Sequence, residues 1–408
     1  MAAQVQPASG QQRPARLLVV DDVPENRELL VRRLRRQGHD DIETAGDGHE
    51  ALAAIRSAHG DATPFDAVLL DVMMPRMSGV EVLEALRADP ALSATPVIMI
   101  SAATELDTVV RCIELGAEDY LPKPFNPVLL RARLGTVLEK KRLRDEVRRQ
   151  LDRMERELAE ARRQQLSMLP DEFPAPNPAW PVAVHAVMHP AREVGGDFYD
   201  CFETTPGRLC LAVGDVSGKG MPAALFMART RSLVRALALQ ALAVTGETLA
   251  PSALMAVVNE ELCKNNPDCN FVTLFLGSLC AKTGALTFAN AGHLPPWHVV
   301  PGAPPQEIPC KPGLPLGLVP DARYRDYAAV LREGDTFVVI TDGLPEMMDA
   351  EGGFYTLERV ATDIASVSHR SAMEIVTELA ARVLDFAGGA TRADDVTALA
   401  VRIGTRPV

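Results

Sequence analysis

Three short runs of consecutive apolar residues constrain the fold of this chain more than any other feature. They are Leu17–Val20, Ala67–Leu70 and Val97–Ile100. Segments with helical patterning lie between them, as at Arg27–Arg36 and Val80–Arg87. Continuous apolar runs are typical of strands buried on both faces of a parallel sheet, and their alternation with helices indicates a doubly wound α/β fold. We predict such a domain at residues 15–135, after a disordered tail at residues 1–14.

Polar residues stand where the predicted strands end. They are Asp21, Asp22, Asp71, Ser101 and Lys123. The carboxyl ends of parallel strands open on one edge of a sheet, where ligands bind. Carboxylates gathered there repel one another, so we expect a divalent cation, Mg²⁺ in the usual hard-ion arrangement, among the three aspartates. A lysine beside them is suited to neutralising a phosphoryl group.

Four stretches of this region resemble the response-regulator receiver family. They read VVDDVPENRELL, DAVLLDVMMPRMSG, PVIMISA and GAEDYLPKPF. The resemblance implies that a histidine kinase phosphorylates Asp71. It implies an Mg²⁺ site whose ligands are Asp21, Asp22, Asp71 and the backbone carbonyl of Met73. It also implies that Lys123 contacts the phosphate and that Ser101 and Tyr120 are a switch pair, in which Ser101 moves towards the phosphate and Tyr120 turns inward.

The next segment, residues 136–168, is rich in charge and contains neither Gly nor Pro. Apolar or neutral residues recur in it at alternating spacings of four and three: Val147, Leu151, Met154, Leu158, Ala161, Gln165 and Met168. This spacing is a heptad seam, typical of a coiled coil, although a single solvated helix is an alternative. We predict a helical linker that pairs as a parallel coiled coil and makes the protein a homodimer, because a lone helix would leave its stripe uncovered.

The remaining region, residues 169–404, has an α+β pattern and four acidic motifs. Strands are predicted at Phe271–Leu279, Leu286–Ala291, Thr336–Thr341 and Val396–Ile403, and helices at Glu247–Cys263 and Ala372–Phe386. The motifs are VGGDFYD around Asp197, GDVSGKG around Asp215, TDG around Asp342 and DDVT starting at Asp394. Acidic groups with few His or Cys suit Mg²⁺ or Mn²⁺ rather than zinc. Two such ions can hold a phosphate and lower the pKa of a bridging water.

These motifs, together with NAGHLP at residues 290–295, resemble the SpoIIE/RsbU-like branch of the PPM metal-dependent phosphatases. The resemblance implies a β-sandwich flanked by helices and two Mn²⁺ or Mg²⁺ ions. It implies that Asp215 bridges the metals, that Asp342 and Asp394 complete one of them, that Asp197 supports the centre and that Val216 offers a backbone carbonyl. The implied reaction is hydrolysis of phosphoserine or phosphothreonine on a partner protein, an anti-sigma-factor antagonist, without a phosphoenzyme.

Four further residues, Lys219, His293, Asp200 and Asp395, lie in or near these motifs. Lys219 stands where many relatives have His, and either faces solvent or binds phosphate. His293 is expected to be structural rather than catalytic. Asp200 and Asp395 are expected to be weaker ligand candidates than their neighbours Asp197 and Asp394.

Composition narrows the classes of partner. A net charge of −12 argues against a general nucleic-acid binder, which needs a basic face. Apolar stretches long enough to span a bilayer are absent from the sequence. The seven cysteines include no CxxC pair, which indicates reduced core thiols. We therefore expect a cytoplasmic protein that binds neither nucleic acid nor membrane.

The sequence thus predicts a response regulator whose receiver, phosphorylated on Asp71, controls a metal-dependent protein phosphatase. A different class of function is a catalytically inactive PPM-like adaptor that binds a partner protein under receiver control. A DNA-binding regulator is disfavoured, because no basic module of helix-turn-helix size follows the receiver region.

Overall fold

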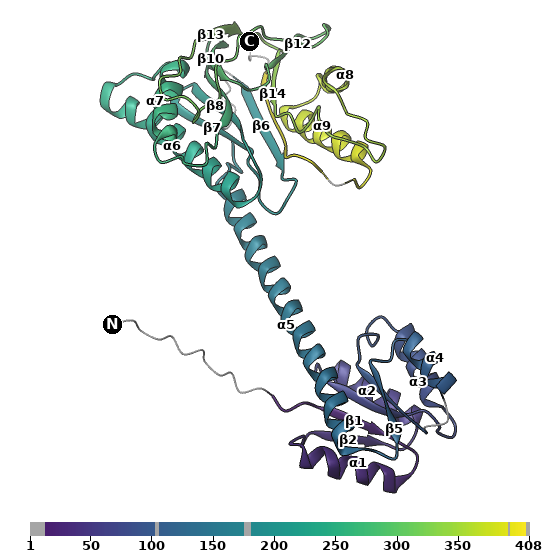
Figure 1. Ribbon diagram of the computed structural model, residues 1–408. Helices are drawn as coiled ribbons and strands as arrows, with labels where there is room; N and C mark the ends of the chain where they lie inside the picture. Colours follow the sequence, from purple (N-terminus) through teal and green to yellow (C-terminus); the bar gives the residue numbers. More distant parts are fainter. Residues whose placement is uncertain (1–12, 103–105, 175–180, 391, 405–408) are drawn as a thin grey trace, which may run out of the picture. The chain divides into compact units, whose positions relative to one another are not determined.

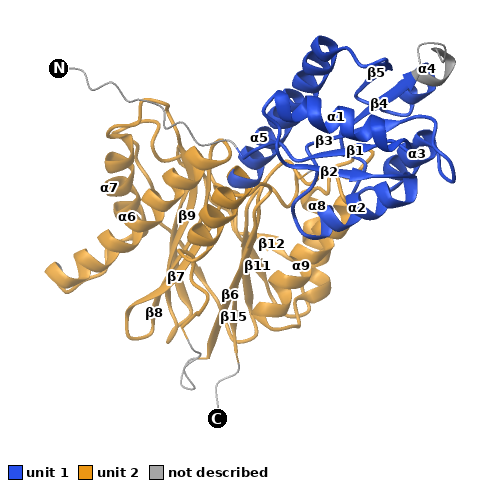
Figure 2. Cartoon of the chain, turned by 90° about the horizontal axis from the view of Figure 1, so that it is seen from below, with its two compact units in different colours: residues 1–153 blue, residues 154–408 orange. Residues whose placement is uncertain are grey.

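The computed structural model describes residues 13–102, 106–174, 181–390 and 392–404. The chain divides into two compact units, Met1–Arg153 and Met154–Val408, which are coloured separately in Figure 2. Most of the predicted disordered tail, residues 1–12, lies outside the described residues. The helices described are each too short or too polar to span a bilayer.

Unit 1 is built on a parallel sheet of five strands in the order β2-β1-β3-β4-β5. The strands are β1 (Leu17–Val20), β2 (Ile42–Ala45), β3 (Ala67–Asp71), β4 (Val97–Ala102) and β5 (Asp119–Lys123). The helices that connect and follow them are α1 (Pro24–Arg36), α2 (Gly48–Gly60), α3 (Gly79–Ala88), α4 (Leu106–Glu114) and α5 (Pro127–Leu166). The predicted doubly wound domain is confirmed.

Both faces of this sheet are buried, which explains the continuous apolar runs. Leu18 and Val20 pack in a core with residues of α2 and α3, whereas Leu17 and Val19 pack in a second core with residues of α1 and α5. Successive side chains of a strand point to opposite faces, so each run supplies both cores. Every position of β1 must therefore be apolar.

Helix α5 begins in unit 1 and ends in unit 2. Its first turns pack on the receiver sheet through Leu130, Leu134 and Val137, and no break occurs at Gly135. Further along, the seam residues Val147, Leu151 and Met154 are more than half exposed. Because the helix ends at Leu166, the predicted seam is shorter than expected and does not include Met168 as a helical residue.

Unit 2 is a sandwich of two five-stranded sheets, with strand orders β13-β10-β9-β8-β7 and β12-β11-β14-β15-β6. The strands of the first are β7 (Phe198–Thr205), β8 (Arg208–Val216), β9 (Val272–Cys280), β10 (Ala285–Ala291) and β13 (Tyr327–Val330). Those of the second are β6 (Val182–His189), β11 (Trp297–Val299), β12 (Gln306–Glu307), β14 (Thr336–Ile340) and β15 (Val396–Ile403). Pairing within both sheets is antiparallel, and a short turn that contains Lys282–Gly284 joins β9 to β10 as a hairpin.

Helices cover the outer faces of this sandwich (Figure 1). They are α6 (Met221–Thr245) and α7 (Pro251–Cys263) on the first sheet, and α8 (Leu357–Val367) and α9 (Ala372–Ala387) beside the second. Alternate residues of β14 separate two cores: Phe337 and Val339 pack between the sheets, and Val338 and Ile340 pack against α8 and α9. The predicted β-sandwich flanked by helices is confirmed.

Helix α7 begins at Pro251 and not at Glu247, where the sequence pattern predicted its start. Gly246 adopts a left-handed conformation with φ of 74° and ends α6, and the new helix begins with Pro251 in its first turn. Proline favours the first helical position and glycine the position after a helix end. The apolar periodicity on both sides of Gly246 concealed this break.

The sandwich core predicts a stability difference between two leucines. Leu399 is fully buried between the sheets and Leu314 is exposed. We expect Leu399→Ala to lower the free energy of unfolding by about 2–5 kcal/mol, and Leu314→Ala to change it by less than about 0.5 kcal/mol. Both tryptophans of the sequence come after residue 153, and Trp297 is buried in unit 2, so urea unfolding followed by tryptophan fluorescence reports this unit. Equal losses for the two variants would contradict the packing.

Candidate functional sites

The first site lies at the carboxyl edge of the receiver sheet. Asp21 and Asp22 follow β1 directly, Asp71 is the last residue of β3, and Lys123 is the last of β5. The oxygens of Asp21, Asp22 and Asp71 lie within 4.8 Å of one another. In the part of the chain that the structure describes, this is the one group of three or more acidic, His or Cys residues gathered so closely.

Lys123 joins two of these aspartates. Its Nζ lies 2.9 Å from Asp21 Oδ2 and 2.9 Å from Asp71 Oδ2. Burial raises the pKa of Asp71 to about 6, with Asp21 and Asp22 adding repulsion and Lys123 opposing the shift. Burial by itself lowers the pKa of Lys123, but its bonds to Asp71 and Asp21 raise it overall. The pocket is therefore short of positive charge even with the lysine in place.

The other predicted receiver residues are Ser101, Met73 and Tyr120, on β4, after β3 and on β5. Ser101 is buried on β4, next to β5, and Met73 is exposed just beyond Asp71. Tyr120 is half-buried on β5, and the Arg133 guanidinium lies 5.5 Å from its ring centre. Topology thus brings Ser101 and the charged residues to one edge, and places Tyr120 three residues before Lys123 on the same strand.

The second site collects one acidic residue from each of four strand ends. Asp197 precedes β7 and Asp215 lies near the end of β8, and these strands pair. Asp342 follows β14 and Asp394 precedes β15, which pair in the other sheet. Each sheet therefore supplies two carboxylates to the same end of the sandwich. A direct bond joins the sheets there, since Thr341 Oγ1 donates to Asp197 Oδ2 at 2.7 Å.

Mutual repulsion marks these carboxylates as neighbours. Burial is the largest cause that raises the pKa of Asp215, to about 7, and repulsion from Asp342 and Asp394 adds to it. Burial likewise raises the pKa of Asp342, to about 6, with repulsion from Asp394 and Glu346 as the next causes. The pKa of Asp197 lies well above its ordinary value because of burial and the nearby Asp215. Such an all-oxygen, electron-rich set fits hard divalent cations, whose charge would remove the repulsion.

Two residues that the motif analysis ranked low have clear partners. Asp395 is buried, and its carboxylate accepts hydrogen bonds from the backbone N–H groups of Ala191, Gly196 and Asp197 at 2.8, 2.7 and 3.2 Å. Asp200 is paired with Arg231 and Arg235 at 3.2 and 2.8 Å. Both carboxylates are thereby engaged in holding the fold.

Lys219 and His293 also have defined surroundings. Lys219 Nζ donates to the carbonyl of Ala393 and lies 3.4 Å from Asp394 Oδ2, so it bridges two acidic motifs instead of facing solvent alone. His293 is buried with Nδ1 3.0 Å from Thr273 Oγ1, and burial lowers its pKa to about 4. The imidazole of His293 is therefore enclosed and neutral at pH 7.

Sequence reasoning missed two contributors, Thr341 and Gln165. Thr341 stands beside the TDG aspartate, and its hydroxyl also accepts from the backbone N–H of Thr397 at 3.1 Å. Gln165 lies in the last turn of α5 and bonds to Gly195 in the first acidic motif. The TDG motif includes Thr341. The heptad spacing places Gln165 on the seam of α5, but nothing in that spacing indicates a contact with Gly195.

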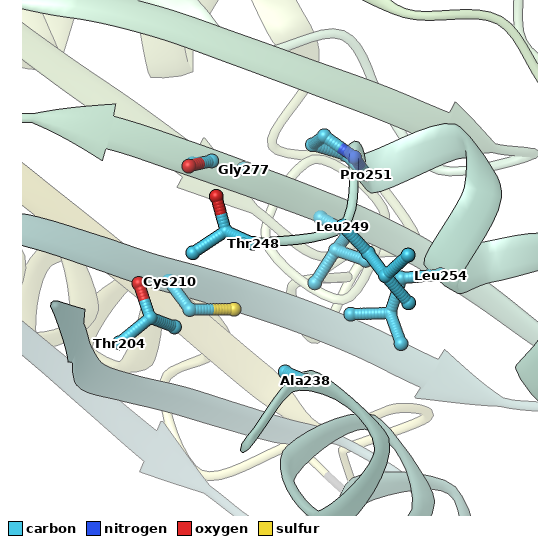
Figure 3. A pocket seen from close by; sticks show the side chains of 10 residues that line it. Thr204, Cys210, Ala238, Thr248, Leu249, Pro251, Leu254 and Gly277 are labelled. Atoms are coloured by element: carbon cyan, nitrogen blue, oxygen red, sulfur yellow. The ribbon is translucent and has the colours of Figure 1, made fainter. Parts of the chain in front are cut away.

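A separate small pocket in unit 2 lies at the far end of strands β7 and β8 from the aspartates (Figure 3). It is lined by Thr204, Cys210, Ala238, Thr248, Leu249, Pro251, Leu254, Leu276, Gly277 and Ser278. These side chains are uncharged, and burial holds the pKa of the Cys210 thiol at about 12. The pocket therefore has no part in the acidic site.

Comparison with known proteins assigns both units. Residues 17–135 match the family described as the response regulator receiver domain, and residues 205–404 match the family described as stage II sporulation protein E, SpoIIE. The SiaA-PP2C domain of Pseudomonas aeruginosa is similar in fold, with a TM-score of 0.54 and 22% identity, covering 62% of this chain and 98% of that one.

Curated relatives match over a shorter stretch. The DNA-binding response regulator MtrA of Mycolicibacterium smegmatis is 43% identical over 125 residues, 31% of this chain and 51% of that protein. The transcriptional regulatory protein TcrA of Mycobacterium tuberculosis is 41% identical over 127 residues, 31% of this chain and 47% of that protein. The chain thus spans about half the length of these relatives.

Repulsion at the second site predicts a pH-dependent cost to folding. The pKa of Asp215 rises from 3.8 to about 7, so its protonated form stabilises the fold below about pH 4 and this contribution is lost as the pH rises through 7. Without metal, Asp215→Asn should therefore melt at a higher temperature than the parent at pH 8, and the difference should shrink towards pH 4. Tryptophan fluorescence melts at several pH values measure it.

The exposed Asp321 provides the matched control for this experiment. Asp321→Asn removes the same charge from a solvated position, so its melting temperature should follow that of the parent at every pH. If Asp215→Asn and Asp321→Asn behave alike, Asp215 carries no repulsion in the folded protein.

Proposed function

Because this chain is a response regulator receiver domain joined to a SpoIIE-type PP2C phosphatase domain, we propose that phosphorylation of Asp71 controls metal-dependent hydrolysis of phosphoserine or phosphothreonine on a partner protein. The observation that carries the proposal is the convergence of Asp197, Asp215 and Asp342 at one end of the sandwich, where burial and nearby carboxylates raise the pKa of each. We place the domains at residues 15–135 and 169–404, with the linker between them.

In the receiver, Asp21, Asp22 and Asp71 would hold Mg²⁺, assisted by the carbonyl of Met73. An Asp71 carboxylate oxygen would attack the phosphorus of a phosphohistidine on the kinase, and the P–N bond would break with the imidazole as leaving group. Lys123, already 2.9 Å from Asp71, would pair with the new phosphate. Ser101, which is buried on the neighbouring strand, would move towards the phosphate. Tyr120 would follow this movement on β5.

In the phosphatase domain, Asp215 would bridge two Mn²⁺ or Mg²⁺ ions, with Asp342, Asp394 and the carbonyl of Val216 as further ligands. When bound, such ions hold the phosphate and lower the pKa of water for attack on phosphorus. The chain's own residues orient this centre: Thr341 fixes Asp197 from the opposite sheet, and Asp395 fixes the backbone beside it. The partner substrate we favour is an anti-sigma-factor antagonist.

One observation supports a catalytically inactive adaptor as the second candidate. Among the described residues, the phosphatase acids are not gathered within 4.8 Å as the receiver acids are. Lys219, 3.4 Å from Asp394, partly satisfies one of them without metal. An adaptor would keep this arrangement permanently, whereas an enzyme would draw the acids together on binding metal. The name of the relative MtrA includes DNA binding. We do not propose DNA binding for this chain, because the match covers only about half of MtrA.

The enzyme proposal predicts metal-dependent turnover. The full chain with Mn²⁺ should release phosphate from a phosphoserine protein and from p-nitrophenyl phosphate, and Asp215→Asn should lower kcat by at least about 100-fold, since a metal ligand is lost. Asp321→Asn again serves as the control and should retain parental kcat. Absence of turnover by the parent chain with either metal, with and without beryllofluoride on Asp71, would favour the adaptor.

The exposed stripe of Val147, Leu151 and Met154 supports a homodimer formed by pairing of α5 with its copy. Inserting three residues after Glu155 should break the heptad phase and abolish the response of activity to beryllofluoride, whereas inserting seven should preserve both. Phosphatase assays and sedimentation analysis of the two insertions measure this. If both insertions respond like the parent, the seam does not carry the signal.

A further inference from the structure

The end of helix α5 is anchored in the phosphatase domain. Leu166, Leu169 and Phe173 pack against the core between the two sheets, and the Phe173 ring stacks 6.1 Å from that of Tyr199. The Tyr199 hydroxyl donates to the carbonyl of Pro170 at 3.4 Å. The helix end and the residues after it are therefore part of unit 2, where they meet the strand that begins beside Asp197.

Gln165 is the polar exception within this apolar anchor. Its side chain is only 5% exposed, while the preceding Gln164 is exposed. The Gln165 amide donates from Nε2 to the carbonyl of Gly195 at 2.5 Å and accepts at Oε1 from the Gly195 N–H at 3.1 Å. We call this reciprocal pair of hydrogen bonds the Gln165 clamp. The clamp holds both the N–H and the carbonyl of Gly195, which lies two positions before Asp197.

The segment held by the clamp has little freedom elsewhere. A Cβ on Gly195 would lie 2.1 Å from Asp395 Oδ2, and one on Gly196 would lie 2.7 Å from the carbonyl of Val216. The Asp395 carboxylate accepts from the N–H groups of Gly196 and Asp197. A movement of Gly195 therefore displaces the backbone that carries Asp197 and presses on Val216, next to Asp215.

From this geometry we propose that Gln165 is a positioning residue through which helix α5 sets the conformation of the Gly195–Asp197 segment, and thereby the phosphatase metal centre. The inference deepens the proposed function, on which it rests, by naming how the linker reaches the site. A shift of α5 by one residue along its axis is about 1.5 Å. Such a shift would break a hydrogen bond of 2.5 Å, so the clamp distinguishes two positions of the helix end.

The test compares Gln165→Ala and Gln165→Glu with Gln164→Ala in the full chain. Gln165→Glu keeps the size of the side chain and an oxygen that accepts from the Gly195 N–H. It replaces the NH₂ group that donates to the Gly195 carbonyl with a second oxygen. Two quantities are measured: the Mn²⁺ concentration that produces half of the metal-induced rise in melting temperature, followed by tryptophan fluorescence, and the ratio of phosphatase activity with and without beryllofluoride.

We expect both Gln165 variants to need about 10- to 100-fold more Mn²⁺, the usual effect of removing a group that orients a metal ligand. Their activity ratio should fall to one, while Gln164→Ala matches the parent in both measurements. A residue with a merely structural role would lower the melting temperature without changing either quantity. Parental Mn²⁺ dependence together with a parental activity ratio in Gln165→Ala would overturn the proposal.

Two outcomes separate this inference from the proposed function. If the parent binds Mn²⁺ but hydrolyses nothing, the enzyme proposal fails, and the Mn²⁺ midpoint of the variants still tests the clamp. If the Gln165 variants do not fold, amide hydrogen exchange of the parent replaces them: exchange within residues 191–199 should change when beryllofluoride occupies Asp71. Unchanged exchange there would also overturn the proposal.

Discussion

Repulsion between partly buried carboxylates governs how both acidic sites of this protein are built. At the receiver edge, Asp21, Asp22 and Asp71 are gathered within 4.8 Å, and Lys123 offsets part of their charge. At the sandwich end, Asp197, Asp215 and Asp342 have raised pKa values. Groups held so close in poorly solvated places are costly to ionise unless a cation joins them. Both domains use strand ends to impose this proximity.

The two sites meet the constraint with different frameworks. Parallel strands deliver the receiver acids to one edge of a single sheet, so side chains from neighbouring strand ends are enough. In the sandwich, two antiparallel sheets must be held together at the same end, which Thr341 does by bonding to Asp197 across them. Asp395 adds a second layer of support, because its carboxylate accepts three backbone N–H groups around the first motif.

Helix α5 gives this arrangement a physical connection to the receiver. It packs on the receiver sheet at its start and is anchored in the sandwich core at its end. Between these ends its apolar stripe is exposed. In our proposal, pairing of this stripe and the Gln165 clamp are successive parts of one route by which the phosphorylation state of Asp71 reaches Asp197.

Much of the fold followed from local pattern. The strands at Leu17–Val20 and Val396–Ile403 have the predicted bounds, because continuous apolar runs require burial on both faces. The helix break at Gly246 and the end of α5 at Leu166 were less accessible, since apolar periodicity continues past both. The ends of a helix depend on a few capping residues, and these are harder to recognise in a sequence than an apolar face that repeats along the whole helix.

The two acidic sets could be proposed from local sequence, because each aspartate adjoins a strand-like run or a glycine turn. The surroundings of these aspartates depend on the folded chain. Asp395 accepts hydrogen bonds from the backbone, Lys219 lies beside Asp394, and the Gln165 side chain turns from the helix seam into the core. These contacts could not be predicted from local sequence, because the residues that form them are far apart along the chain. Gln165 and Gly195 are 30 residues apart, and Asp395 and Gly196 are 199 apart, so no local spacing records their contact.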